Sequence, residues 1–455
     1  MIKKTLSIIF VVAITFSLFT GCAGSNESPE GTSAGGGTTA AAAETERKPV
    51  TLKLWHLWAE DTDPESIQAR IKEWAKAYGE KNPGITVEAM GNATVDKTLT
   101  ALSSGDGPDI LMNQWPNCAT WSDKGALLDL TDYVNNDAGF DKNDIIQAAW
   151  DRTTYKDRIY GIPFGIGSSE IFYNKDLLAK AGYTAPPQTM EELVEMAEKL
   201  TIQDDKGNIV QLGFLPDYPW LDNVLWPVAF GASWIDKETN KITFDSPEIA
   251  AAYQWQVDIY KKYGVEPLTK YKSGFGNEAQ DPFISGKLAM MFRAEGQIGT
   301  IKKYAPDLNY GIATIPYPAS RPDLKGSMFI TANVWNISNG SKNKDEAWKA
   351  LADLTSKEQM KYFSQGIQNS GMLFSRITAL EALQSMEVPG ELKEVAKMLQ
   401  GPNVTGFPMV AYINEYLTAI NDEMSLCLSL KQPVEQAQKN VVEKMQPLAD
   451  QNPIK

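Results

Sequence analysis

The sequence predicts an α/β protein built from two lobes. A chain of 455 residues exceeds the size at which a single hydrophobic core keeps growing. Strand and helix patterns alternate from Val50 onward, which favours parallel sheets with helices packed against them. The stretch Gly161–Lys175, GIPFGIGSSEIFYNK, places a Gly/Ser-rich bend before an apolar strand, and such a bend can absorb the backbone rotation of a hinge. We therefore expect the first crossing between the lobes here, with the ligand lying against it.

The residue pattern over 50–112 predicts a βαβ unit at the start of the folded part of the chain. Apolar and polar residues alternate over 50–55, which is typical of a strand with one buried face. A helix follows in which four apolar residues recur on one face, namely Ile67, Ile71, Trp74 and Tyr78. Residues 85–89 alternate again, and 109–112 read as a third strand. Strands joined by a helix in this way build parallel sheets.

Later segments continue the alternation. Thr189 and Glu192 form a capping box in front of an apolar helical stripe. Residues 203–208, QDDKGN, lack the alternating ligands and distal Glu of a calcium loop and predict a tight hairpin turn. A further strand-like crossing is predicted over 310–313, and the last third of the chain is mostly helical.

Composition excludes several classes of function. Lys and Arg number 43 against 57 Asp and Glu, and this acidic balance argues against a nucleic-acid partner. His56 is the only histidine, so zinc sites with paired histidines are excluded, and no nucleotide-binding loop or nucleophile elbow is present. No cofactor or metal is expected. A carboxylate pair that acts on a glycosidic bond remains open.

The N-terminus reads as an export signal followed by a tether. Residues 1–21 combine Lys3 and Lys4 with an apolar run that is shorter than the about 20 residues of a membrane-spanning helix. The sequence before Cys22 is similar to a bacterial lipobox, except that Phe19 stands where Leu is usual. Residues 22–48 are therefore expected to be a lipidated cysteine and a disordered tether. Cys118 and Cys427 are expected to be buried free thiols, although a bridge between them stays open.

Several blocks, in order, resemble the extracellular solute-binding proteins of ABC sugar importers. The blocks are TLKLWHLW with KNPGITVEAM, SGDGPDILMNQW with KGALLDLTDYV, RIYGIPFG with IFYNKDLLAKAGYTAPPQTMEELVEMAEKL, FISGKLAMMF with YGIATIPYP, and SKNKDEAWKALADLTSKEQ. Each block is weak by itself, but the ordered set spreads over nearly all of 50–450.

The resemblance implies a type II periplasmic-binding-protein-like fold, with two α/β lobes joined by a three-segment hinge. It places the crossings near 165–169, 313–316 and 372–376. Lobe 1 would comprise 49–165 and 316–373, and lobe 2 would comprise 166–315 and 374–455. The sequence departs from the family where FRAEGQIG replaces a segment that often carries Gly-Pro-Trp, with Gln297 in the place of the stacking aromatic residue.

In lobe 1 and the hinge, candidate ligand contacts lie where predicted strands end, as expected for loops at the carboxyl ends of parallel strands. Aromatic rings suit the C–H faces of a sugar, and polar groups suit its hydroxyls. The candidates are Trp58, Glu60, Asn113, Gln114, Trp115, Ser168 and Glu170. Each tryptophan has a core-packing alternative, and the alternative for Glu170 is a solvated charge.

In lobe 2 and the C-terminal segment, polar residues again stand beside aromatic ones. The candidates are Asp222, Asn223, Trp226, Phe275, Arg293, Glu295, Arg376 and Tyr412. Trp226 and Tyr412 can equally belong to the core. For Arg293 and Glu295, the alternative is that they form a salt bridge with each other and do not contact the ligand. An unpaired Arg293 would instead favour an acidic sugar.

These observations predict a monomeric, lipid-anchored protein on the outer face of the cell membrane. It would capture a mono- or oligosaccharide between its lobes and deliver it to the permease of an ABC transporter, and it would not be an enzyme. The enzyme alternative is a secreted glycoside hydrolase or lyase that uses a carboxylate pair. A second alternative is a protein that presents a ligand to a membrane sensor.

Overall fold

A computed structural model describes residues 48–59, 63–218, 223–276, 278–366 and 371–454. The candidates Cys22, Glu60 and Asp222 lie outside these residues. The part of the chain from Lys48 onward forms a compact unit. Its secondary structure alternates between strands and helices, as the sequence predicts.

The predicted βαβ unit is confirmed. Strand β1 (Val50–Trp55) pairs in parallel with β2 (Ile85–Met90), and helix α1 (Ile67–Lys81) connects them. The helix begins where the Ser66 hydroxyl accepts a hydrogen bond from the Ala69 backbone N–H, 3.2 Å away. The predicted apolar face of α1 is buried. Strand β3 (Ile110–Gln114) pairs in parallel with β1 and leads directly into α3 (Trp115–Asp123).

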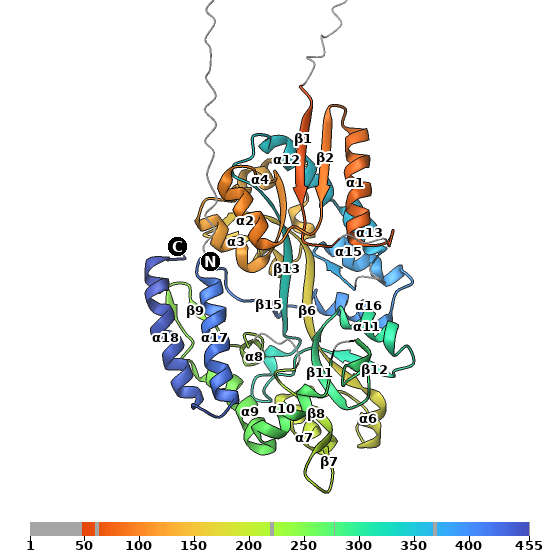
Figure 1. The fold of residues 1–455 in the computed structure, drawn as a ribbon, viewed down its shortest axis with the longest axis vertical. Coiled ribbons are helices and arrows are strands. Elements are labelled where there is room, and N and C mark those ends of the chain that lie inside the picture. The colour runs from red at the N-terminus through yellow and green to blue at the C-terminus, as the bar shows by residue number, and fades with distance from the viewer. Residues whose placement is uncertain (1–47, 60–62, 219–222, 277, 367–370, 455) are drawn as a thin grey trace, which may run out of the picture. The chain divides into compact units, whose positions relative to one another are not determined.

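One sheet runs through the whole unit, in the order β2-β1-β3-β13-β6-β11-β8-β7. Figure 1 shows β6 (Ile162–Asn174) and β13 (Met328–Ile337) side by side between the part with β1, β2 and β3 and the part with β7 (Ile202–Gln203), β8 (Ile209–Phe214) and β11 (Leu288–Ala294). The predicted hairpin turn joins β7 and β8, which are antiparallel.

The Gly/Ser-rich stretch is a continuous strand rather than the expected bend. All 13 residues of β6 belong to the sheet, and the strand pairs with β13, β11, β12 (Tyr310–Ala313) and β14 (Leu373–Phe374). Its irregularity is a register shift against β13, between Ala332 and Val334. Pairing with partners on both edges overrides the weak strand preference of the glycines.

Helices cover the sheet on both sides of this central pair, and short strands and 3₁₀ turns connect them (Figure 1). Before β6 these elements are α2 (Val95–Ser104), α4 (Thr131–Asn136), η1 (Lys142–Asp144), α5 (Gln147–Trp150), β4 (Thr154–Tyr155) and β5 (Arg158–Ile159). Between β6 and β13 they are α6 (Lys175–Lys180), α7 (Met190–Leu200), α8 (Trp226–Ala229), β9 (Ile235–Asp236), β10 (Lys241–Ile242), α9 (Pro247–Tyr263), α10 (Val265–Ser273), η2 (Glu278–Gln280), α11 (Gln297–Tyr304) and η3 (Pro322–Leu324).

The predicted capping box of Thr189 and Glu192 is confirmed at the start of α7.

The C-terminal part is largely helical, as expected. Its elements are α12 (Lys344–Leu354), α13 (Lys357–Ser364), α15 (Ile377–Ala382), η4 (Leu383–Ser385), α16 (Gly390–Met398), β15 (Val404–Thr405), α17 (Ile413–Leu428) and α18 (Val434–Gln451). Helices α17 and α18 pack against each other, and α17 also contacts α3 and α9. This helix therefore ties together elements on both sides of the central strands.

Cys118 and Cys427 are free and buried. Burial raises the pKa of the Cys118 thiol to about 12 and that of the Cys427 thiol to about 11, so both are protonated at neutral pH. Across the described ranges, no helix is long and apolar enough to span a bilayer. No group of three or more His, Cys, Asp or Glu side chains suited to a metal ion occurs in the same ranges.

Candidate functional site

Neighbouring strands place short polar residues side by side on one face of the central sheet. Asn333 of β13 pairs with Gln114 of β3, and Thr331 pairs with Gly167 of β6. Directly paired residues, and residues two apart on a strand, point to the same face. We call the following set the polar row: Gln114, Asn333, Thr331, Gly167 and Ser169. Gln114 is exposed and the other four are half-buried, so this face is reachable from solvent.

The polar row consists of neutral groups that both donate and accept hydrogen bonds. The side-chain amides of Gln114 and Asn333 make no hydrogen bond with the described part of the chain. The Thr331 hydroxyl donates a long bond, 3.3 Å, to the Gly167 carbonyl. At Gly167 a Cβ atom would lie only 2.5 Å from Thr331 Oγ1, so glycine lets the Thr331 hydroxyl lie directly against the backbone of β6. Such a row can pair with the hydroxyls of a neutral ligand.

The candidate Trp58 packs on the same face of the sheet. Its ring centroid lies 6.4 Å from that of Trp335, which is two residues along β13 from Asn333, and 6.2 Å from that of Phe164. Trp58 is half-buried. The structure therefore brings Trp58 and Gln114 to one face, as expected for loops that follow parallel strands.

Ser168 and Glu170 point to the opposite face, together with Glu295. Glu295 accepts a hydrogen bond from the Ser168 backbone N–H at 2.8 Å and lies 3.4 Å from its hydroxyl. Glu170 is 0% exposed, and neither carboxylate oxygen has a hydrogen-bond partner among the described residues. Strand alternation explains the difference from our expectation, because a shift of one residue reverses the face. In the proposed site we therefore replace Ser168 and Glu170 by Gly167 and Ser169.

The two buried carboxyl groups have perturbed acidities. Burial, and then the charge of Glu295, raise the pKa of Glu170 well above its ordinary value. Burial also raises the pKa of Glu295 to about 7. The alternative in which Arg293 and Glu295 pair with each other is not found, since Arg293 lies 3.6 Å from Asp281. Burial lowers the pKa of this guanidinium and raises that of Asp281.

Three other candidates lie on the buried side of β3 and in the adjoining helices. The Asn113 side-chain oxygen accepts hydrogen bonds from Gln114 N at 2.9 Å and from Asn117 Nδ2 at 3.0 Å. The buried Trp115 ring packs 6.5 Å from that of Phe407. Tyr412 is also buried and stacks on Tyr416. These residues hold α3 and α17 in place rather than face the polar row.

The remaining candidates are engaged in the core or elsewhere. Trp226 is 1% exposed, contacts Trp255 and donates its indole N–H to the Pro216 carbonyl at 3.0 Å. The Asn223 amide donates to Asn421 of α17 at 2.9 Å. Phe275 packs on Tyr271 at the end of α10. Arg376 is buried and bonds to Thr355, Asp141 and Asp144. We do not retain these four in the proposed site.

The sequence matches the profile of a known protein family. The sequence profile described as "Bacterial extracellular solute-binding protein" matches residues 73–411. The chain belongs to the bacterial extracellular solute-binding protein family. The resemblance noted in the sequence is thereby confirmed, and so is an extracytoplasmic setting for the family.

Relatives and solved structures of the solute-binding family agree with the fold. A structure titled CpMnBP1 with mannotriose bound is 28% identical, has a TM-score of 0.72, and is matched over 87% of this chain and 99% of that one. A provisionally named binding protein of Brucella abortus (strain 2308) is 28% identical over 310 residues, 67% of this chain and 72% of the relative. The maltotriose-binding protein of Pyrococcus abyssi is 21% identical over 324 residues, 68% of this chain and 63% of that protein. The predicted α/β fold of two lobes is confirmed by these structural matches.

Four members of the polar row were not among the predicted contacts. These four residues are Gly167, Ser169, Thr331 and Asn333. They carry neither a charge nor an aromatic ring, and most of the predicted contacts were chosen for one of these two features. For Gly167 and Ser169 the alternation of residues 162–166 is no guide, because the register shift against β13 between Ala332 and Val334 interrupts the period of two. For Thr331 and Asn333 the contact arises from long-range pairing of β13 with β3 and β6, which no local pattern reveals.

Proposed function

We propose that this solute-binding protein captures a neutral mono- or oligosaccharide at the polar row. The observation that carries the proposal is the juxtaposition of two side-chain amides, Gln114 and Asn333, with the hydroxyls of Thr331 and Ser169 across β3, β13 and β6. Hydroxyl-rich ligands need such paired donors and acceptors. The polar row contains no Lys or Arg, which favours a neutral sugar over a phosphate ester. The mannotriose-bound structure and the maltotriose-binding protein point the same way.

We further propose that the ligand is held between two lobes that close on it. The three crossings of the proposed hinge correspond to β6, the segment after β12, and β14, and β12 and β14 both pair with β6. Arg376 still bonds to Asp144 of the first lobe, so we place the end of the third crossing after Arg376 rather than at 373. Ligand that contacts both lobes only when they are closed would shift the population towards closure.

Delivery to an ABC permease and anchoring through a lipid on Cys22 complete the proposal. The support is the leader and lipobox-like sequence before Cys22, and the family's extracellular setting. Mass spectrometry of the mature protein from its membrane fraction would test the anchor. A diacylglyceryl group on an N-terminal Cys22 is the expected result, and an unmodified chain cut elsewhere would contradict it.

We propose that no bond of the ligand is broken. The described carboxyl pair, Glu170 and Glu295, is buried on the face opposite the polar row, and so it is not placed to act on a sugar bound there. Time-resolved product analysis with oligosaccharides tests this directly. The sugar should be recovered unchanged, and any shortened product would favour the hydrolase or lyase alternative.

Replacing Asn333 by alanine should weaken sugar binding by about tenfold, because one paired amide is lost. Asn333 is half-buried and its amide has no partner in the described chain, so stability should change little. Isothermal titration across mannose, mannotriose, maltose and maltotriose would measure the change for whichever sugar binds. Phe275→Ala is the matched control, since Phe275 packs on α10. Equal loss of affinity in both variants would contradict the site.

A further inference from the structure

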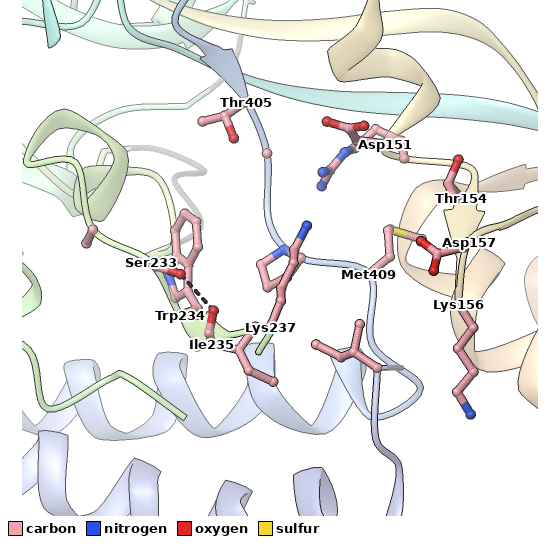
Figure 2. A pocket seen from close by; sticks show the side chains of 15 residues that line it. Asp151, Thr154, Lys156, Asp157, Ser233, Trp234, Ile235, Lys237, Thr405 and Met409 are labelled. Atoms are coloured by element: carbon pink, nitrogen blue, oxygen red, sulfur yellow. Dashed lines mark hydrogen bonds between the residues drawn. The ribbon is translucent and has the colours of Figure 1, made fainter. Parts of the chain in front are cut away.

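A cavity lies apart from the polar row. It has a volume of about 370 Å³ and is lined by three stretches that are distant in sequence, within 151–157, 232–237 and 405–409, together with Ile454. Figure 2 shows Ser233, Trp234 and Lys237 on one side and Asp151, Thr154, Lys156 and Asp157 on the other. No member of the polar row lines it. Its size would accommodate a monosaccharide or a smaller molecule.

Arg152 is a buried cation in the wall of this cavity. It is 4% exposed, its Nη1 donates to the Phe407 carbonyl, and its guanidinium lies over the Trp115 ring at 5.7 Å from the centroid. No carboxylate in the described ranges forms an ion pair with Arg152, and its Nε has no acceptor there. Burial lowers its pKa to about 10, so it stays charged at neutral pH. A buried charge without a counter-ion is costly, and an anion in the cavity would compensate it.

The backbone is shaped around this guanidinium. A Cβ atom on Gly406 would lie 2.7 Å from Arg152 Nη1 and 2.7 Å from the Ile330 carbonyl oxygen. Only glycine therefore lets the β15 segment pass so close to Arg152. The strand thus fixes one edge of the cavity directly against the cation.

Two lysines add positive charge at the rim. Lys156 pairs with Asp123 at 3.2 Å, whereas Lys237 forms no ion pair with the described residues. Figure 2 shows Lys237 projecting into the space between Trp234 and Met409. Asp151 and Asp157 also line the cavity, but both are exposed, and Asp151 accepts a hydrogen bond from Gln147 at 2.9 Å. With Lys156 already paired, the cations of this wall that have no ion pair among the described residues are Arg152 and Lys237.

We propose that this cavity binds a small oxyanion-bearing ligand, with Arg152 and Lys237 as its counter-ions. The ligand is either a free ion such as phosphate or a monosaccharide that carries a phosphate or carboxylate group. Both share the charged oxygens that a guanidinium and an ammonium recognise. This site is separate from the polar row and does not depend on the identity of the transported sugar.

The test is calorimetric titration of the purified chain with four probes at constant ionic strength in chloride buffer: phosphate, sulfate, glucose 6-phosphate and glucuronate. At least one probe should bind saturably, and Lys237→Ala should weaken it about tenfold. Lys349→Ala is the matched control, because Lys349 is an exposed lysine of α12 outside the cavity. Arg152→Met should abolish binding, and if that variant does not fold, the exposed Lys237 decides the result.

The outcomes separate the sources of the ligand. Equal affinity for phosphate and glucose 6-phosphate would assign a free ion, and binding of only the sugar derivatives would assign an anionic monosaccharide. The proposal is overturned if none of the four probes binds saturably. It is also overturned if Lys237→Ala binds as tightly as the unchanged chain.

Discussion

Replacing Arg376 by methionine should lower the free energy of unfolding by about 3–5 kcal/mol and leave sugar affinity unchanged. Arg376 is 1% exposed, donates to the Thr355 carbonyl at 2.6 Å and to the Asp141 carbonyl at 2.9 Å, and lies 3.3 Å from the Asp144 carboxylate. Its removal leaves the buried Asp144 carboxylate without a positive partner and with only its hydrogen bonds from Thr378, and it takes the donor away from the two carbonyl groups. Denaturant unfolding, combined with calorimetry of the bound sugar, would measure both quantities.

A matched control separates burial from charge. Arg321 pairs with Asp323 at 2.8 Å, but both side chains are exposed, so Arg321→Met should cost less than about 1 kcal/mol. Arg376 was a candidate ligand contact in the sequence, and this experiment distinguishes the two roles. A stable Arg376→Met variant with weakened sugar binding would show that Arg376 contacts the ligand and would contradict the structural role.

The protein should lose stability as the pH rises from about 5 to about 8, because of Glu295. Its pKa is 4.5 ordinarily and about 7 in the folded protein, where burial disfavours the charged form. Between these values the folded state binds more protons than the unfolded state, so the stabilisation is complete below the unfolded pKa and disappears as the pH passes the folded one. The shift corresponds to about 3 kcal/mol. Glu170, whose pKa is also raised, acts in the same direction.

Glu295→Gln isolates this contribution. The amide oxygen can still accept the hydrogen bond from Ser168 N–H, but it does not titrate. Unfolding curves at several pH values should therefore converge for the two proteins at acidic pH and separate at alkaline pH, with the variant more stable. The exposed Glu266→Gln serves as the control. Parallel curves for the wild-type protein and Glu295→Gln would contradict the assigned titration.

Sequence patterns predicted the fold because they are local. The alternation over β1, the apolar face of α1 and the capping box of α7 each depend on neighbours within a few residues, and the structure confirms all three. The hinge stretch was less predictable. Glycines and serines at 165–169 favour a bend when read alone, but pairing with β13, β14 and β11 keeps them extended.

The candidate site was harder to predict than the fold for a related reason. Sequence reasoning selected Ser168 and Glu170 of β6, and these residues lie on the face opposite the polar row, since which face of a strand a residue occupies depends on its partners. Trp58 and Gln114 lie on the face of the polar row because they follow parallel strands, a rule that topology alone supports. Trp226 shows the opposite case, because a tryptophan beside polar residues reads as a sugar contact but fills the core.

The most direct test of the central claim is sugar binding to Gly167→Leu. A Cβ atom at this position would lie 2.5 Å from Thr331 Oγ1, so a leucine has to displace this hydroxyl and is expected to fill the polar row. The thermal unfolding midpoint of the variant shows whether it is folded. Gly299→Leu is the matched control, since nothing lies within 4 Å of a Cβ atom there. Calorimetry should show that the unchanged protein and Gly299→Leu bind the same sugar equally, while Gly167→Leu loses at least about 30-fold in affinity. If a folded Gly167→Leu binds that sugar as tightly as the unchanged protein, the polar row is not the ligand site.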